Sequence, residues 1–347
     1  MSISLCVIQS TKLRNKFDAV YSTCKSVHAG DPVDSMYLSW SDMLDVLAQL
    51  EMWKSTATFV TPEHVLYGSP RLAYHIRILF DAMLQHSYVP HEFLRGSISP
   101  LIKDTNGDES SIDTYRGLAL GVVFSDLFEH ALLGKISHFL TTDPLQFGYK
   151  KRRSTSHAVH TLRCTIDYFI NRGSSVFAAF LDCSKGFDEV NHDEIFLKLI
   201  QRRVPLCIVD LLIYWYSSLT SMVKWDCAYS FSFSVPSGVR QGGVLSPLLF
   251  AIYVDDLILA LRKLNVGCHI IDLFLSCIVY ADDICLIAPS RSALQLLLDT
   301  CEHYGLLWCL SYNPSKSGIM HFGKDVSRPT FTMYGIVLDY TQEHSCV

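Results

Sequence analysis

The chain has little of what marks a secreted, membrane-spanning or zinc-binding protein. Its 347 residues include 12 cysteines, but no two form a Cys-x-x-Cys pair. This pattern argues against a disulfide framework or a zinc site and is typical of reduced thiols used as small core residues. No apolar run reaches the ~18–20 residues of a membrane span, and residues 1–8 are too short and too uncharged for a secretory signal. We therefore expect an intracellular protein, in the nucleus or the cytoplasm, with no membrane partner.

An excess of positive charge is also missing. The net charge is −5 at pH 7, with 49% hydrophobic residues. This length and composition allow a large core and about two domains. Proteins that hold nucleic acid usually present a basic surface, because much of the affinity comes from neutralising phosphates. A nucleic-acid-binding role leaves two alternatives: basic side chains gather in one cleft, or other segments supply them.

Three carboxylates follow or separate short apolar runs, and they form the most informative pattern in the chain. Asp282 and Asp283 stand between Ser276–Tyr280 and Ile284–Ala288, which are rich in β-branched and aromatic residues and predict two strands of a hairpin. Asp182 ends a third such run. Like charges near buried strands are costly unless a cation neutralises them, and Mg²⁺ prefers oxygen ligands. The pattern therefore predicts a divalent metal site.

A second Tyr-x-Asp-Asp sequence, Tyr253–Asp256, stands in different surroundings. Ser246 and Pro247 are a helix-start signal, and apolar residues then recur at three- and four-residue steps. On such a helix the side chains of Asp255 and Asp256 point about 100° apart. We therefore assign this pair a structural role. An isolated Asp-Asp pair is more often a solvated turn, so the assignment of chemistry to the other pair depends on its strand context.

Around the carboxylates the chain resembles the reverse transcriptase of a non-LTR (LINE-type) retrotransposon. The resemblance covers roughly residues 50 to 340, and the motifs follow one another in the family's order. They are Ser99–Lys103, Thr114–Arg116, Gln146–Thr155, Phe180–Asp188, Ser237–Pro247, Tyr280–Asp283 (the YADD motif) and Asn313–Ser317.

The resemblance implies an α+β, right-hand polymerase fold, with a small antiparallel palm sheet backed by helices. It predicts a helical extension over residues 1–90, fingers over 91–173 and palm over 174–347, with the reverse transcriptase domain at about 95–340 and a thumb that is absent or incomplete. The helices expected from periodicity are Trp40–Trp53, Ala73–His86 and Pro247–Leu264. The resemblance implies two more helices behind the palm sheet, Asp193–Arg203 and Ser292–Tyr304.

The resemblance also implies an RNA-directed DNA polymerase, a nucleotidyltransferase that uses an RNA template, a DNA primer and dNTPs. Asp182, Asp282 and Asp283 would be catalytic and hold two Mg²⁺ ions, with Mn²⁺ as a substitute. Residues implied in dNTP or template binding are Lys103, Arg116, Phe187, Gln241, Gly242 and Lys316. Cationic side chains suit phosphates, and the Phe187 ring would block a ribose 2′-hydroxyl. A core role for Phe187 and a plain surface role for Lys316 remain alternatives.

Under the first of the two alternatives for basic charge, the residues Lys150–Arg153 and Arg240 would also line the cleft. A solvated surface run is the alternative for Lys150–Arg153. The chain departs from the family's pattern at three places. Gly186 stands for the usual Ala, Gly117 stands for the usual Pro and predicts a less rigid loop, and the segment from Lys54 lacks the usual turn. An inactive relic, or a nucleic-acid-binding module without chemistry, is the alternative function. The motifs carry no signal for an oligomeric state.

Overall fold

The structure, a computed structural model, describes residues 3–27, 36–103, 108, 110–183, 186–324 and 328–342. The chain forms two compact units, each assembled from segments that are distant in the sequence. Unit 1 comprises Met1–Lys12, Thr142–Asn191 and Phe250–Val347, and unit 2 comprises Leu13–Thr141 and His192–Leu249. Helices α1 (Ile3–Val27) and α10 (Ser246–Lys263) contribute residues to both. The expected boundaries at residues 90 and 173 concern functional domains and stay a prediction.

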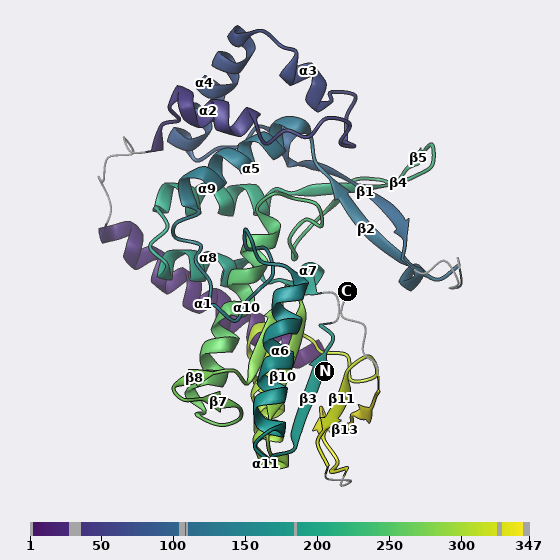
Figure 1. Ribbon diagram of the computed structural model, residues 1–347. Coiled ribbons are helices and arrows are strands. Elements are labelled where there is room, and N and C mark those ends of the chain that lie inside the picture. Colours follow the sequence, from purple (N-terminus) through teal and green to yellow (C-terminus); the bar gives the residue numbers. More distant parts are fainter. Residues whose placement is uncertain are drawn as a thin grey trace. The chain divides into compact units, whose positions relative to one another are not determined.

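Unit 1 is built on a five-stranded sheet with the order β14-β11-β3-β10-β9. Its strands β3, β10 and β11 are labelled in Figure 1. Neighbouring strands are antiparallel except for β11 and β14, which are parallel. This sheet confirms the expected α+β class and the small, mainly antiparallel palm sheet. The strands are β3 (Val176–Leu181), β9 (Cys277–Tyr280), β10 (Asp283–Ala288), β11 (Gly318–Phe322) and β14 (Asp339–Tyr340).

Helices cover both faces of this sheet, and all six residues of β3 are accordingly buried. Helix α6 (Thr155–Ile170) packs on one face, where its Ala158 and Ile166 join Ala178 of β3 in a buried cluster. Helix α11 (Arg291–Trp308) contacts β3 and β10. Side chains alternate between the faces of a strand, so these contacts enclose the sheet. The smaller elements of unit 1 are α7 (Gly186–Glu189), β7 (His269–Ile270), β8 (Leu273–Phe274), β12 (Thr332–Met333) and β13 (Ile336–Val337).

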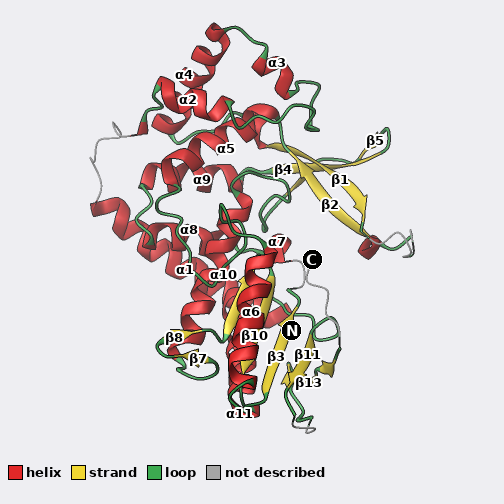
Figure 2. Ribbon diagram, in the orientation of Figure 1, coloured by secondary structure: helices red, strands yellow, loops and turns green. Residues whose placement is uncertain are grey.

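Unit 2 combines a second sheet with a group of helices (Figure 2). The sheet has the order β2-β1-β4-β5, and β6 also pairs with β4. Its strands are β1 (Arg95–Ile102), β2 (Tyr115–Leu120), β4 (Thr220–Trp225), β5 (Ala228–Tyr229) and β6 (Phe233–Ser234). The helices are α2 (Trp40–Leu47), α3 (Pro62–Leu66), α4 (Pro70–His86), α5 (Val123–Ile136), α8 (His192–Gln201) and α9 (Leu206–Ser217), with the 3₁₀ turns η2 (His91–Leu94) and η3 (Ile112–Thr114).

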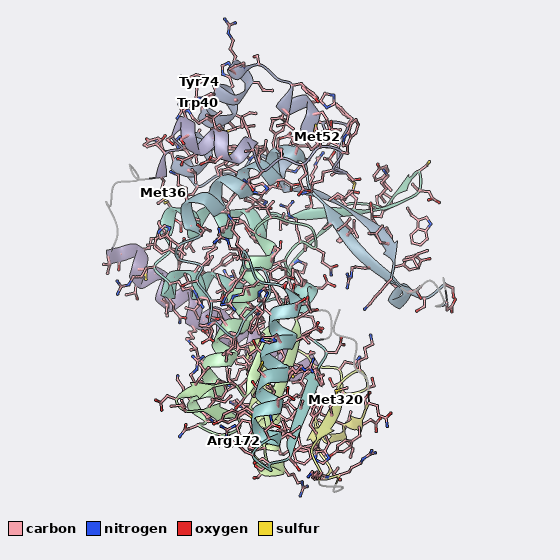
Figure 3. All side chains as sticks on the ribbon, viewed as in Figure 1. Met36, Trp40, Met52, Tyr74, Arg172 and Met320 are labelled. Carbon is pink, nitrogen blue, oxygen red and sulfur yellow. The ribbon has the colours of Figure 1, made fainter. Side chains whose placement is uncertain are left out.

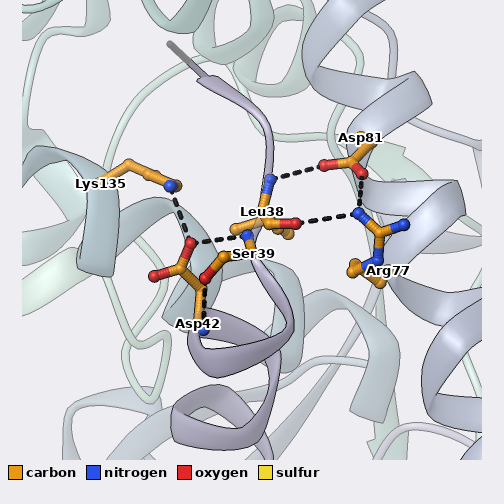
Figure 4. Close-up of polar contacts among 6 residues, drawn as sticks. All are labelled: Leu38, Ser39, Asp42, Arg77, Asp81 and Lys135. Atoms are coloured by element: carbon orange, nitrogen blue, oxygen red, sulfur yellow. Dashed lines mark hydrogen bonds and ion pairs between the residues drawn. The ribbon is translucent and has the colours of Figure 1, made fainter.

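The predicted helices over residues 73–86, 193–203, 247–264 and 292–304 are confirmed as α4, α8, α10 and α11, with ends that shift by a few residues. The prediction for 40–53 is wrong in length, because α2 ends at Leu47. Its start is fixed by a reciprocal capping box between Ser39 and Asp42, whose carboxylate also binds Lys135 (Figure 4). Beyond its end, Trp53 has φ of 66° and its N–H donates to the Glu63 carboxylate. That contact replaces the helical hydrogen bond that a longer α2 would need.

Large apolar side chains remain at the surface of the helical part of unit 2. Trp40, Met52 and Tyr74 are each roughly half exposed (Figure 3).

None of the helices in the described part of the chain combines the length and apolar character that crossing a bilayer requires. Every cysteine side chain that the structure describes is a free thiol, and the expected reduced state stays a prediction.

Candidate active site

The two acids of the YADD motif lie at the tip of a tight hairpin. Strands β9 and β10 pair with Tyr280 opposite Asp283, which leaves Ala281 and Asp282 as a two-residue turn. Ala281 has φ of 59°, in the left-handed region that L-residues other than glycine rarely adopt. The predicted hairpin is therefore confirmed, and the backbone of its turn is conformationally strained.

The register of the sheet brings Asp182 to the same end. In the antiparallel pair of β3 with β10, Leu181 is opposite Ile284. Extending this register by one residue sets Asp182 opposite Asp283. The side chains are consistent with this register, because the negative charges of all three acids raise the pKa of the same buried thiol, that of Cys183. The pKa of that thiol is raised well above its usual value, first by burial and then by the charges of Asp282, Asp182 and Asp283.

These acids are not arranged as a finished coordination shell. Within the described ranges, no three His, Cys, Asp or Glu side chains are grouped so that they could hold a metal ion. Asp182, Asp282 and Asp283 are nevertheless all partly exposed at one edge of the sheet. Three carboxylates suit a hard divalent ion in donor chemistry. The strand register and the donor type thus fit a metal site, although the three carboxylates are not gathered around one point.

The other Tyr-x-Asp-Asp sequence has the helical context predicted for it. Asp255 lies in α10, is only 6% exposed, and accepts a hydrogen bond of 2.7 Å from the Asp143 N–H. Asp143 also pairs with Arg262 of the same helix at 2.6 Å. Tyr253 accepts a 2.8 Å hydrogen bond from the Tyr304 hydroxyl through its main-chain oxygen. Asp255 therefore anchors a loop to its helix.

The loop Asn313–Ser317 is fastened to the backbone of Asp182. The Asn313 N–H donates to the Asp182 carbonyl oxygen at 2.9 Å. The Asp182 N–H donates to Ser317 Oγ at 3.2 Å. Lys316 belongs to this loop and its side chain is exposed. Unit 1 thus brings Lys316 and the three acids into one neighbourhood.

Phe187 lies on α7, half-buried, in unit 1. Its ring stacks on Phe250 with centroids 4.7 Å apart and an angle of 14°, and meets the Tyr149 ring edge-on at 6.3 Å. A Cβ on the preceding Gly186 would lie 3.1 Å from Cζ of Phe250. The glycine that replaces the family's usual alanine therefore makes room for this stack. Its half-buried ring is consistent with either role expected for Phe187.

In unit 2, the phosphate-binding candidates Lys103 and Arg116 lie on the β1–β2 hairpin. Leu101 is opposite Arg116, and the Lys103 N–H donates to the Thr114 carbonyl oxygen at 2.8 Å. Lys103 and Arg116 consequently lie on the same face of the hairpin, and both are exposed. The prediction of a loop at Gly117 is wrong, because Gly117 lies inside β2 and pairs with Pro100 of β1.

Gln241 and Gly242 pack against the same strand. The Ala119 N–H donates to the Gln241 carbonyl oxygen at 2.8 Å. Gly242 has φ of 111°, and a Cβ there would lie 2.9 Å from the Ala119 oxygen. The close approach that requires a glycine is therefore to β2. The template contacts expected for Gln241 and Gly242 stay a prediction.

Two cations expected in a nucleic-acid cleft have internal partners instead. Arg240 forms an ion pair with Glu129 and donates to Ser125 Oγ at 3.2 Å, and burial lowers the pKa of its guanidinium. Lys150 donates to the carbonyl oxygens of Thr142 and Asp143, and burial lowers its pKa as well. In the protein alone these two side chains thus bind other residues of the chain, and their expected contact with phosphates stays a prediction. Residues 151–153 are exposed.

Two further residues carry contacts that the sequence analysis did not identify. Lys54, in the divergent segment, pairs with Asp126 at 3.0 Å. Gln146 is fully buried beside the hairpin turn. The sequence did offer one sign of a role for Gln146. This polar residue begins a motif that matches the family, and an aromatic residue and a glycine follow it.

Acids at the ends of paired strands, one of them on a tight turn, are a donor arrangement suited to metal-assisted phosphoryl transfer. A family model described as reverse transcriptase (RNA-dependent DNA polymerase) matches residues 102–343. This match covers more than half of the chain, so the chain belongs to the reverse transcriptase family. Its relatives confirm the resemblance to the enzymes of non-LTR retrotransposons.

Among these relatives is the probable RNA-directed DNA polymerase from transposon BS of Drosophila melanogaster, 26% identical over 80% of this chain and 31% of its own length. The RNA-directed DNA polymerase from mobile element jockey of Drosophila funebris is 24% identical over 77% of this chain and 30% of its own length. The chain thus spans about a third of the length of these curated relatives. Among solved structures, apo telomerase from Candida tropicalis is similar with a TM-score of 0.48 and 12% identity, covering 77% of this chain and 58% of that one.

Proposed function

We propose that this chain is the polymerase part of a non-LTR retrotransposon reverse transcriptase, which extends a DNA primer with dNTPs on an RNA template. The observation that carries the proposal is the register that sets Asp283 opposite Asp182, with Asp282 on the adjoining turn. Membership of the family supports the same reaction. With these substrates the activity would belong inside the cell, in the nucleus or the cytoplasm.

Divalent metal ions are general in this family, and the carboxylates would hold them here. Asp182 and Asp282 would bind two Mg²⁺ ions with help from Asp283, and Mn²⁺ would serve as a substitute. When bound, such a pair activates the primer 3′-hydroxyl and neutralises charge on the triphosphate. The fixed backbone of Asp182 would hold its carboxylate in place, because both its N–H and its carbonyl oxygen are hydrogen-bonded to the Asn313–Ser317 loop.

The remaining roles concern substrate positioning. Lys316 would approach the pyrophosphate from the loop attached to Asp182, while Lys103 and Arg116 would bind the β- and γ-phosphates from the exposed face of their hairpin. Phe187 would lie under the sugar, supported by its stack on Phe250. Gln241 and Gly242 would contact the template side.

Primer extension on an RNA template with Mg²⁺ tests the proposal. Asp282→Asn and Asp182→Asn should lower the rate by roughly 100-fold or more, because each removes a charge that compensates the metal. Asp255→Asn is the matched control, since an amide oxygen can still accept the hydrogen bond from the Asp143 N–H; its metal dependence should be unchanged. If the wild-type chain binds primer–template but does not extend it, the result would instead support the alternative function, a nucleic-acid-binding module without polymerase activity.

A further inference from the structure

The YADD turn is supported from outside its own hairpin by a segment that comes before β3. Gln146 forms a parallel bridge with Val279 of β9. The Val279 N–H donates to the Leu145 oxygen at 2.9 Å, and the Phe147 N–H donates to the Val279 oxygen at 2.7 Å. These two hydrogen bonds fix the segment along the outer edge of β9, and they bring the Gln146 side chain to the turn.

The Gln146 amide binds the main chain of the turn. Its Oε1 accepts hydrogen bonds from the Gly148 N–H at 2.9 Å and from the Ala281 N–H at 3.2 Å. Only the oxygen of a glutamine amide can accept, so two N–H donors aimed at one atom fix the orientation of the amide. Ala281 is the residue in the left-handed conformation, immediately before Asp282.

Gly148 makes the close approach possible. A Cβ at this position would lie 2.4 Å from the Ala281 nitrogen and 3.0 Å from its Cα. No side chain fits in that space. Two residues of one motif, Gln146 and Gly148, therefore meet the same point of the catalytic hairpin.

Packing alone does not account for a glutamine at this position. Gln146 is 0% exposed. Its Nε2 is buried and has no hydrogen-bond partner among the described residues. An unmet buried donor is unfavourable, whereas an apolar side chain of similar size would incur no such cost. What the glutamine adds is the acceptor for the turn.

We propose that Gln146 is a positioning residue that, together with Gly148, holds the strained Ala281 turn and thereby sets the direction of the Asp282 carboxylate. The catalytic consequence rests on the proposed polymerase function. The structural part of the inference does not, because it concerns a hydrogen bond to the Ala281 N–H that is measurable in the protein without any substrate.

Hydrogen exchange of the turn tests the structural part. Gln146→Met keeps the length of the side chain and removes the acceptor, so the amides of residues 280–283 should exchange at least about tenfold faster while those of β3 keep their protection. Gln295→Met is the matched control, since Gln295 also forms hydrogen bonds in unit 1, to Asp299 and Thr332, away from the turn. Gln146→Glu keeps an acceptor and should retain protection of the turn.

Unchanged exchange at the turn in a folded Gln146→Met protein would overturn the proposal, and so would an equal rise in the Gln295→Met control. Should Gln146→Met fail to fold, Gln146→Asn takes its place, because its shorter side chain keeps an amide but cannot reach Ala281. The functional part predicts a fall in kcat of about tenfold for Gln146→Met, a higher Mg²⁺ concentration at half-maximal rate, and a KM for dNTP within about twofold of wild type. If the wild-type chain does not extend primers, the polymerase proposal fails while the exchange result still decides the role of Gln146.

Discussion

Asn313 and Asp182 are joined through their main chains, with the Asn313 N–H 2.9 Å from the Asp182 oxygen. This hydrogen bond links two motifs that lie far apart in the sequence. The hydroxyl of Ser317 completes the link by accepting from the Asp182 N–H. The position of Asp182 thus depends on the Asn313–Ser317 motif as well as on its own strand.

Ser317→Ala should therefore disturb Asp182 without altering any acid. The Asp182 N–H loses its acceptor, which should lower the free energy of unfolding by about 1–2 kcal/mol and reduce primer extension. Chemical denaturation and extension rates measure both effects. Ser315→Ala is the control, because Ser315 lies in the same loop, is exposed and donates its N–H and its hydroxyl to Asn313 Oδ1. Equal losses in the two variants would show that the loop acts as a whole and that the contact to Asp182 has no special weight.

Restoring the family's alanine at Gly186 should destabilise this particular chain. The new Cβ would meet the Phe250 ring at 3.1 Å, and such overpacking costs about 1–3 kcal/mol. Thermal unfolding of Gly186→Ala alone and together with Phe250→Leu checks the cause. The smaller side chain at 250 should make the alanine better tolerated. A Gly186→Ala protein as stable as wild type would contradict the predicted clash.

Phe187→Val separates the two roles of that aromatic ring. If the ring excludes a ribose 2′-hydroxyl, the variant should gain ribonucleotide incorporation selectively while the fold stays intact. A core role predicts a loss of about 1–3 kcal/mol by cavity formation and no change in sugar preference. Parallel extension assays with dNTPs and rNTPs, together with denaturation curves, distinguish them. The half-buried stack on Phe250 leads us to expect a small stability loss in either case.

Binding of primer–template should weaken steeply with salt, because a few cations would supply most of the affinity. Lys103→Ala and Arg116→Ala should each lower the slope of log K against log salt by about 0.7–0.9. Fluorescence anisotropy at several salt concentrations measures it.

Arg240→Met provides the contrast to the two exposed cations. It removes the partner of Glu129 and should lower stability by about 3–5 kcal/mol, while the salt slope stays the same in the fraction that remains folded. A lower slope for Arg240→Met would show that this side chain reaches phosphate after all.

Local patterns identified the parts of the site whose structure is local. Short apolar runs around Asp282 and a three- and four-residue period around Asp255 were enough to separate a hairpin from a helix. The same reading of local patterns could not reveal the partner of Arg240, because Glu129 lies 111 residues away in sequence. It failed for the end of α2, where a tertiary hydrogen bond from the Trp53 N–H to Glu63 replaces the helical one. The hydrogen bond from the Ala281 N–H to Gln146 could not be predicted from local patterns either, because only folding brings these two residues together.

The order in which the chain is made has a consequence for the central strand β3. Its partners β10 and β11 are synthesised only after residues 192–249, a whole segment of unit 2. During translation β3 is therefore synthesised before the strands that flank it and stays unpaired until they emerge. All of its residues are buried in the finished sheet. Strands that are so distant in sequence pair slowly, and until they pair their unpaired edges are exposed and prone to aggregation. The nascent protein should consequently depend on chaperones until β11 has left the ribosome.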